Sequence, residues 1–293
     1  LIIDIPMRKL GANAPIPPMR MGNWRFALYL LILSGFWTSF NQIWITMPEY
    51  IRDFVDTSDM LDDVGGFFSA ISYINPDIII RILDTHLPDI AALPASAQMQ
   101  HLIEALEAAR IRVEPYQVEQ LFEQYLAYGQ PVTAEMLRPI AERLIDIGKQ
   151  VNPEYLIKFD AGAIVVFQLL VSYIIARWNP FMAMVAGVVV ASIGIGATAF
   201  FYTGWLVALA IVIFAFGEMM ASPKSQEYIG RIAPTHQKAL YMGYYFWAVA
   251  LGNLFGGILS GQGYGYIARD MGRPDLMWLL FGAIGMFTAL VLV

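Results

Sequence analysis

Residues 181–201 have the sequence FMAMVAGVVVASIGIGATAFF and contain no charged side chain. An α-helix rises about 1.5 Å per residue and the hydrocarbon core of a bilayer is about 30 Å thick, so an apolar run of this length can cross a membrane. The strands of a membrane β-barrel would alternate polar and apolar residues over about ten positions, and this run does not alternate. The stretch therefore predicts a membrane-spanning helix.

Five further stretches share this apolar character. They are residues 26–47, 161–176, 205–221, 239–259 and 276–293. Glu218 is the one charged residue in these runs, and the short run 161–176 can extend backwards through Tyr155. We therefore predict an all-α integral membrane protein with six transmembrane helices. The membrane in question is the cell (inner or plasma) membrane, and the lipid bilayer is the first expected partner.

The composition excludes several other classes of protein. The chain of 293 residues is 58% hydrophobic and 14% charged, whereas soluble domains are about 45–50% apolar and 25% charged. It has no cysteine, and its three scattered histidines, His86, His101 and His236, form no metal-binding pattern. The net charge of −6 argues against nucleic acid as a partner. No nucleophile–base pair, P-loop or dinucleotide motif appears, so we expect no enzyme, no cofactor and no metal.

Acidic residues are concentrated in one segment. Residues 49–160 contain 19 Asp and Glu against 8 Lys and Arg, while the rest of the chain contains 5 against 10. Within this segment Val118, Leu121 and Phe122 recur at helical spacing, with Tyr125 one turn later. The same spacing occurs before them in Leu102, Ile103 and Leu106, and after them in Leu137, Ile140, Leu144 and Ile147. We expect three or four short helices packed as a small cap. The cap is either a solvated spacer or lid, or a surface that binds a partner.

Basic residues in short loops predict the orientation of the chain. The loops on one side contain eight of them, Arg8, Lys9, Arg20, Arg25, Arg177, Lys224, Arg231 and Lys238. On the other side, Arg269 and Arg273 lie in the glycine-rich stretch 261–275, which we expect to be a loop. The first side is therefore expected to be cytoplasmic and the acidic insert extracytoplasmic. The predicted organisation is a cytoplasmic linker (1–24), a transmembrane helix (25–50), the acidic helical insert (51–150) and five transmembrane helices (151–293). A leucine start and an apolar end suggest part of a larger protein.

Glu218 is the first candidate functional residue. A carboxylate inside a spanning helix costs several kcal/mol unless it faces protein or a water-filled cavity. It is suited to binding a proton or pairing with a substrate ammonium group. The alternative is a carboxylate near a helix end at Ser222-Pro223-Lys224, from which it reaches water or Lys224.

A second group of charges precedes the second span. Glu154 and Lys158 lie four residues apart and can pair on a helix, and Asp160 follows them. They are either an extracytoplasmic gate or ordinary charges at a helix end. Asn152-Pro153 before them predicts a helix start, because proline is tolerated in the first turn.

Two amides lie within the first span. Asn41 and Gln42 sit between Trp37 and Trp44, and amides in hydrocarbon usually hydrogen-bond across helices or line a cavity. Trp44 is also suited to anchoring the helix at the membrane interface. In the fifth span, Gly252 and Gly256 form a small-residue face that favours close helix packing.

Several of these runs resemble one transporter family. The runs are 217–223 (GEMMASP), 231–234 (RIAP), 242–246 (MGYYF) and 251–254 (LGNL). They resemble the tenth and eleventh helices of proton-dependent oligopeptide transporters (POT/PTR), a family of the major facilitator superfamily. Residues 36–42 (FWTSFNQ) and 151–153 (VNP) resemble its helices seven and eight. The resemblance implies that the six helices are the C-terminal half of a major facilitator fold, and that an N-terminal half with six more helices is missing.

The resemblance also implies roles for individual residues. Glu218 would contact the amino terminus of a peptide, Asn152 would contact substrate, and Tyr245 would lie near the cavity with Asn41 and Gln42. Asn41 stands where the family has a glutamate used in a proton-sensitive salt bridge, and the acidic insert is not a standard family feature.

We therefore expect a secondary active transporter, a proton-coupled symporter of small peptides or related solutes that works by alternating access. Glu218 would bind a proton or substrate, and Glu154, Lys158 and Asp160 could gate the site. The alternatives are a major facilitator transporter of another solute, such as a sugar, drug or metabolite, or a non-transporting receptor or scaffold that uses the acidic cap.

Overall fold

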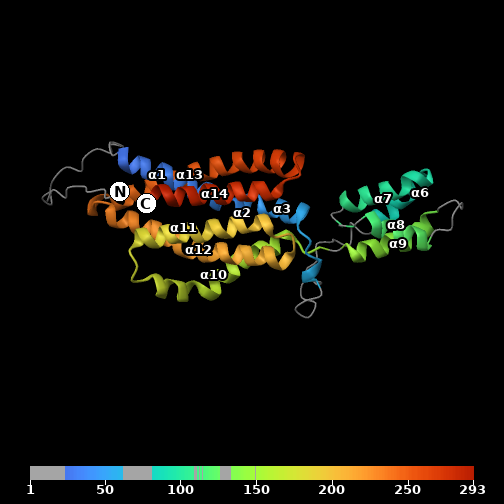
Figure 1. Cartoon of the computed structure of the whole chain (residues 1–293), viewed down its shortest axis with the longest axis horizontal. Coiled ribbons are helices and arrows are strands. Elements are labelled where there is room, and N and C mark those ends of the chain that lie inside the picture. Colours follow the sequence, from blue (N-terminus) through green and yellow to red (C-terminus); the bar gives the residue numbers. More distant parts are fainter. Residues whose placement is uncertain are drawn as a thin grey trace. The chain divides into compact units, whose positions relative to one another are not determined.

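Almost all of the described chain is helical (Figure 1). A computed structural model describes residues 24–61, 81–108, 111, 113, 115–125, 133–148 and 150–293. Within these ranges the β-pairing is limited to an isolated parallel bridge between Asp56 and Thr203. Six helical stretches are long and apolar enough to cross a membrane, which confirms the predicted all-α membrane fold. The predicted linker, apart from Trp24, lies outside the described residues.

The six spans follow the predicted apolar runs. They are Trp24–Ile45, Pro153–Ile175, Pro180–Phe200, Gly204–Ile232, Lys238–Asp270 and Pro274–Leu292. Their helices are α1 (Trp24–Phe40) and α2 (Gln42–Ile45), α10 (Pro153–Ile175), α11 (Pro180–Ala197) with the 3-10 turn η4 (Thr198–Phe200), α12 (Gly204–Ile232), α13 (Lys238–Gln262) with the π-helix η6 (Gly263–Asp270), and α14 (Pro274–Leu292). The short helix α3 (Met47–Phe54) follows the first span, and the 3-10 turn η5 (Thr235–Gln237) precedes α13.

The chain divides into two compact units. Unit 1 contains the spans and comprises the chain up to Val55, Pro153–Tyr202 and Leu206–Val293. Unit 2 comprises Asp56–Asn152 and Thr203–Trp205. The insert therefore folds as a body of its own between the first and second spans.

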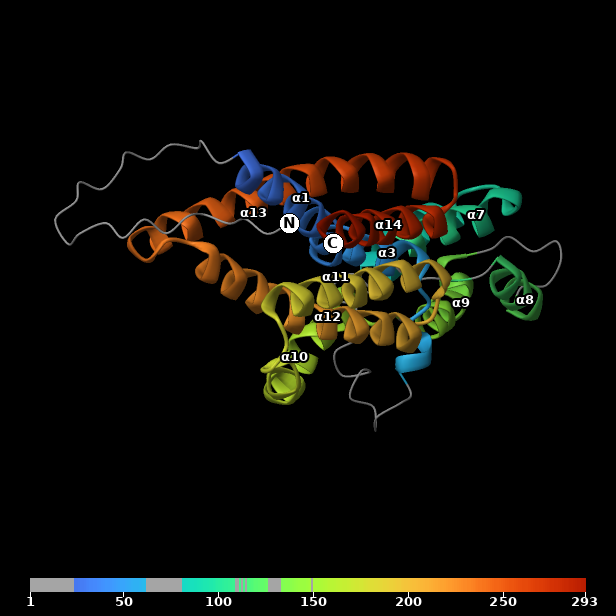
Figure 2. The same cartoon turned by 60° about the vertical axis from the view of Figure 1, so that its left-hand side comes forward.

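Unit 1 is a bundle of closely packed helices. α1 lies against α13 and α14, and α14 also packs along α11 (Figure 2). α11 and α12 approach backbone to backbone, because a Cβ placed on Gly187 would lie 2.5 Å from the amide nitrogen of Ala221. Small residues permit such close packing in membranes, where dispersion and hydrogen bonds rather than hydrophobic burial hold helices together.

Two predicted boundaries in this bundle were wrong. α12 does not end at Pro223 but continues to Ile232. Proline removes one backbone donor, here the one that would bond the carbonyl of Met219, and spanning helices tolerate such a loss without ending. The glycine-rich stretch 261–275, expected as a loop, contains the π-helix η6, which extends the fifth span to Asp270.

Unit 2 is helical, as predicted for the insert. Its elements are η1 (Ser58–Met60), the π-helix η3 (Ile82–His86), α6 (Leu87–Ala91), α7 (Ala95–Ala108), α8 (Pro115–Tyr125) and α9 (Ala134–Ile147). The residues predicted at helical spacing form its core: Leu102, Leu106, Val118, Leu137, Ile140 and Leu144 are buried together. The side chains of Tyr125 and Ile147, and residues 62–80 of the insert, lie outside the described set.

Candidate functional site

Asp160 of α10 and Glu218 of α12 form a carboxyl pair inside unit 1. Their side chains interact directly with one another. Asp160 is 2% exposed, and Glu218 is half-buried. One oxygen of each, Asp160 Oδ1 and Glu218 Oε2, is buried and finds no hydrogen-bond partner among the described groups. The two acids were predicted separately, as a gate residue and a proton or substrate site, and the fold brings them together.

The start of α10 explains why Asp160 lies inside the bundle. The helix begins at Pro153, as the Asn152-Pro153 pair predicts, so Asp160 lies two turns into a spanning helix rather than at its end. Phe167 of α10 also packs against Phe216 of α12, with the rings tilted and their centroids 5.2 Å apart. α10 and α12 therefore hold the two carboxyl groups together from facing positions.

Two carboxyl groups in contact have a restricted chemistry. Like charges at this separation cannot both be ionised without a large cost in a poorly solvated site, so such a pair shares a proton or holds a cation between its members. A proton held between Asp160 and Glu218 would remove the repulsion between two like charges. The geometry is therefore suited to reversible proton binding. No group of three or more His, Asp or Glu that could hold a metal ion occurs in the described part of the chain.

Lys224 does not neutralise Glu218. Its Nζ donates to Glu227 Oε2 at 2.8 Å, and Arg231 binds the other oxygen of Glu227. All three residues lie beyond Pro223, on the helical extension of α12 that the sequence did not predict. The alternative interpretation, in which Glu218 reaches Lys224 at a helix end, is thus replaced by a Lys224–Glu227 pair.

Asn41 and Gln42 lie at the interface between the first span and α13. Gln42 is fully buried; its Nε2 donates to the carbonyl of Gly256 at 3.1 Å, and its Oε1 accepts from Thr46 Oγ1 at 2.6 Å. Thr46 in turn is hydrogen-bonded to Ser260 Oγ at 2.7 Å. Gln42 thus forms part of an interhelical polar ladder.

Asn41, unlike Gln42, has a side-chain donor without a hydrogen-bond partner among the described residues. Its side chain is 8% exposed, yet Nδ2 has no hydrogen-bond partner in the described structure, and the same is true of Nε1 of Trp37, one turn earlier. Both donors lie on one face of the first span, because they are four residues apart. Tyr245 of α13 packs edge-on against Trp37 with ring centroids 6.2 Å apart, and its hydroxyl lies 3.1 Å from Ser225 Oγ of α12. Trp37, Asn41 and Tyr245 thus form a second polar cluster.

The remaining candidates are distributed more widely. Glu154 and Lys158 are exposed on the first two turns of α10, unlike buried Asp160. Asn152 is half-buried and belongs to unit 2, whereas all the other candidates belong to unit 1. Asn253, which lies between Gly252 and Gly256 in α13, donates to the carbonyl of Val249 in its own helix at 3.1 Å.

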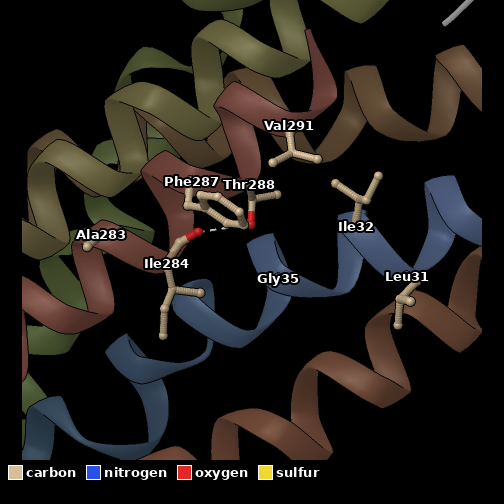
Figure 3. Close-up of a pocket in the computed structure, with 8 residues that line it drawn as sticks. All are labelled: Leu31, Ile32, Gly35, Ala283, Ile284, Phe287, Thr288 and Val291. Atoms are coloured by element: carbon tan, nitrogen blue, oxygen red, sulfur yellow. Dashed lines mark hydrogen bonds between the residues drawn. The ribbon is translucent and has the colours of Figure 1, made fainter.

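An apolar groove of about 460 Å³ lies between α1 and α14 (Figure 3). Leu31, Gly35, Ile284 and Phe287 are among its lining residues. Its one side-chain hydroxyl, that of Thr288, already donates to the carbonyl of Ile284 at 2.9 Å. The groove therefore offers no free polar side chain to a solute.

Comparison with known proteins finds relatives that share one name. The multidrug resistance protein MdtH of Aeromonas salmonicida is 33% identical over 110 residues, which is 38% of this chain and 28% of that protein. MdtH of Klebsiella pneumoniae is 34% identical over 85 residues, 28% of this chain and 20% of that protein. MdtH of Proteus mirabilis is 28% identical over 124 residues, 40% of this chain and 30% of that protein. Each alignment thus spans less than a third of the relative. No protein-family model and no solved structure matches the chain.

The sequence patterns missed one charged cluster. Asp53, at the end of α3, accepts hydrogen bonds from Arg52, from the hydroxyl of Tyr264, and from Arg269 at 2.8 Å. Burial by itself would raise the pKa of Asp53, but the three donors outweigh it and hold that pKa well below its usual range. Arg269 was counted only as a loop charge, and no local pattern links residue 53 to residues more than 200 positions away.

Proposed function

We propose that this chain is part of a proton-coupled secondary transporter of the major facilitator type, in which Asp160 and Glu218 form the proton site. The observation that carries the proposal is the contact between buried Asp160 of α10 and half-buried Glu218 of α12. Ionisable residues within spanning segments are costly and commonly mark proton relays and substrate pathways. The six apolar helices and the MdtH relatives support transport as the general activity.

The pair offers a simple coupling device. When it holds a proton it carries one negative charge less, and when it releases the proton it becomes able to attract a cationic solute. Proton and cation would then compete for Asp160 and Glu218. As the site opens alternately to each side of the membrane, this competition exchanges protons for the cationic solute. In this proposal the acidic insert faces the extracytoplasmic side, as the basic loops predict.

We propose a small organic cation of the drug-like class as the substrate. The relatives carry multidrug resistance in their name, and a carboxyl pair that has released its proton suits an organic cation. The aromatic and orphaned polar groups of Trp37, Asn41 and Tyr245 offer stacking surfaces and hydrogen-bond donors for such a molecule. Gln42 would line the substrate cavity beside these residues.

A second candidate substrate is a small peptide. It is favoured by the run 217–223 (GEMMASP), in which Glu218 would pair with a peptide amino terminus. The exposed residues Glu154 and Lys158 would then gate the site with Asp160, and Asn152 would contact the peptide. The MdtH relatives give this finer assignment no support, so it ranks second.

Transport of ethidium driven by a pH gradient tests the proposal. The protein that contains this chain is reconstituted in liposomes, and ethidium flux is followed with and without an imposed gradient. Gradient-driven flux is expected to be lost in Glu218→Gln and Asp160→Asn, because neither variant keeps the carboxyl pair. Competition by dialanine would favour the peptide assignment.

Asp89→Asn is the matched control, since it neutralises an exposed acid on α6 of unit 2. It is expected to transport like the parent protein. Full gradient-driven flux in Glu218→Gln would overturn the assignment of the proton site.

The receptor or scaffold alternative makes a different prediction for the insert. Deleting residues 69–148 removes most of unit 2 but keeps Asp56, Thr57 and Gln150. A transporter is expected to keep gradient-driven flux, whereas a receptor that binds its partner through the cap would lose its activity.

A further inference from the structure

A short segment of unit 2 is hydrogen-bonded to both chain positions from which the carboxyl-bearing helices start. We name this segment, Asp56–Met60, the strap. α10, which carries Asp160, begins directly after the strap's partners Gln150 and Val151. α12, which carries Glu218, begins at Gly204.

Thr57 makes the attachment on the α10 side. Its side chain is 1% exposed, its Oγ1 donates to Gln150 Oε1 at 2.9 Å, and the same oxygen accepts from the amide of Val151 at 2.8 Å. Gln150 Oε1 also accepts from the Thr57 amide at 2.7 Å, and its Nε2 donates to Asp56 Oδ1 at 3.1 Å. Buried, fully paired polar groups of this kind hold a single geometry.

Asp59 and Asp56 make the attachment on the α12 side. The amide of Gly204 donates to the carbonyl of Asp56 at 2.8 Å and to Asp59 Oδ1 at 3.1 Å, and the amide of Trp205 donates to Asp59 Oδ2 at 3.3 Å. A carboxylate at a helix N-terminus satisfies free amide groups and interacts favourably with the helix dipole. Met60 is fully buried and its Sδ lies close to Gly204, which leaves no room for a side chain there.

We propose that the strap sets the separation of Asp160 and Glu218 by fixing the starts of α10 and α12 to one another. Asp160 lies two turns into α10 and Glu218 about four turns into α12. Each helix is unbroken from its first residue to its carboxyl group. Thr57 and Asp59 are thus positioning residues, and the insert becomes a control element of the proton site. This inference rests on the proposed function.

A matched pair of double variants tests it. Thr57→Val with Asp59→Ala removes the side-chain attachments on both sides, whereas Thr57→Ser with Asp59→Asn keeps the hydroxyl and one acceptor oxygen. Glu119→Ala, on an exposed position of α8, serves as the control. Since the chain has no cysteine, Tyr155→Cys and Leu206→Cys place two spin labels on half-exposed positions in the first turns of α10 and α12.

The distance distribution between the labels is expected to broaden in the Val/Ala variant and to match the parent protein in the Ser/Asn variant and the control. The midpoint of the pH profile of ethidium flux is expected to move by about half a pH unit or more in the Val/Ala variant only. An unchanged label distance in the Val/Ala variant would overturn the strap inference, whatever happens to flux. A Ser/Asn variant with the broadened label distance of the Val/Ala variant would also overturn it. The same holds if the label distance broadens in the Val/Ala variant but the midpoint of the pH profile does not move, provided that flux depends on Glu218. Gradient-driven flux that survives Glu218→Gln would instead overturn the proposed function, independently of the label distances.

Discussion

Asp53 of α3 is bound to Arg269 of η6 at 2.8 Å. This contact joins the short helix that follows the first span to the end of the fifth span. Tyr264 completes the contact, because its hydroxyl donates both to Asp53 and to the carbonyl of Glu49. The guanidinium of Arg269 also lies 4.9 Å from the centre of the Tyr264 ring. The Asp53 carboxylate thus accepts hydrogen bonds from three side chains, which belong to α3 and η6.

Asp53→Asn is therefore expected to lower stability by about 2 kcal/mol, because hydrogen bonds from charged donors are each worth about 1.5–3 kcal/mol and an amide keeps only part of them. Thermal unfolding in detergent measures the effect. The folded-state pKa of Asp53 is lowered, so the stabilisation is present above the ordinary aspartate pKa and is lost as the pH falls below about 4.

The difference in melting temperature between parent and Asp53→Asn should thus stay constant from pH 8 to pH 5 and narrow only in stronger acid. Asp270→Asn, an exposed acid at the end of η6, is the control and should melt like the parent protein. A difference that disappears between pH 7 and pH 5 would contradict the assigned contact.

Gly252 of α13 packs against Trp37 of α1 so closely that an added methyl group would overlap the tryptophan Cβ and approach its backbone carbon to 2.9 Å. Gly252→Ala is expected to cost about 1–3 kcal/mol, the usual penalty of overpacking. Gly257→Ala on the same helix meets nothing within 4 Å and should change stability by less than about 0.5 kcal/mol. Equal melting temperatures for the two variants would refute this packing.

The helices themselves were largely predictable because uninterrupted apolar runs have one low-energy structure in hydrocarbon. The core of the insert was predictable for a related reason, since Leu102, Val118 and Leu144 repeat at helical spacing and all become buried. What failed was the treatment of Pro223 and of the glycines after Gly261 as helix ends. α12 continues through Pro223, and in η6 the tertiary bonds of Tyr264 and Arg269 to Asp53 accompany a helix that the local rule did not predict.

The candidate site was predictable only in its parts. Glu218 stood out because it is a charge in an apolar run, but its partner Asp160 lies 58 positions earlier in a segment that resembled an ordinary helix end. Which helices face one another is decided by packing, for example by Gly187 against Ala221, and no single-chain pattern encodes it. The same holds for the orphaned donors of Trp37 and Asn41.

Gln42→Met is expected to loosen the first span from α13. The variant preserves the length of the side chain but removes the bonds to Gly256 and Thr46. Interhelical hydrogen bonds in membranes are worth about 0.6 to 2 kcal/mol, so thermal stability should fall by about that amount.

Gln168→Met is the matched control, because this half-buried glutamine bonds only to Ser172 within α10 among the contacts described for it. It should leave the melting temperature unchanged. If instead the control lost as much stability as Gln42→Met, the polar ladder would not be what holds these helices together.

Leu144→Ala is expected to destabilise unit 2 without affecting the spans. Leu144 is fully buried in a core made only of insert residues, and removing a buried leucine side chain usually costs about 2–5 kcal/mol. Hydrogen exchange on the whole protein should therefore speed up across α7, α8 and α9 while the amides of α11 and α14 stay protected. Glu135→Ala, exposed in the first turn of α9, should leave both sets unchanged. Loss of protection in α11 and α14 as well would mean that the insert and the spans unfold as one cooperative body, contrary to the division into two units.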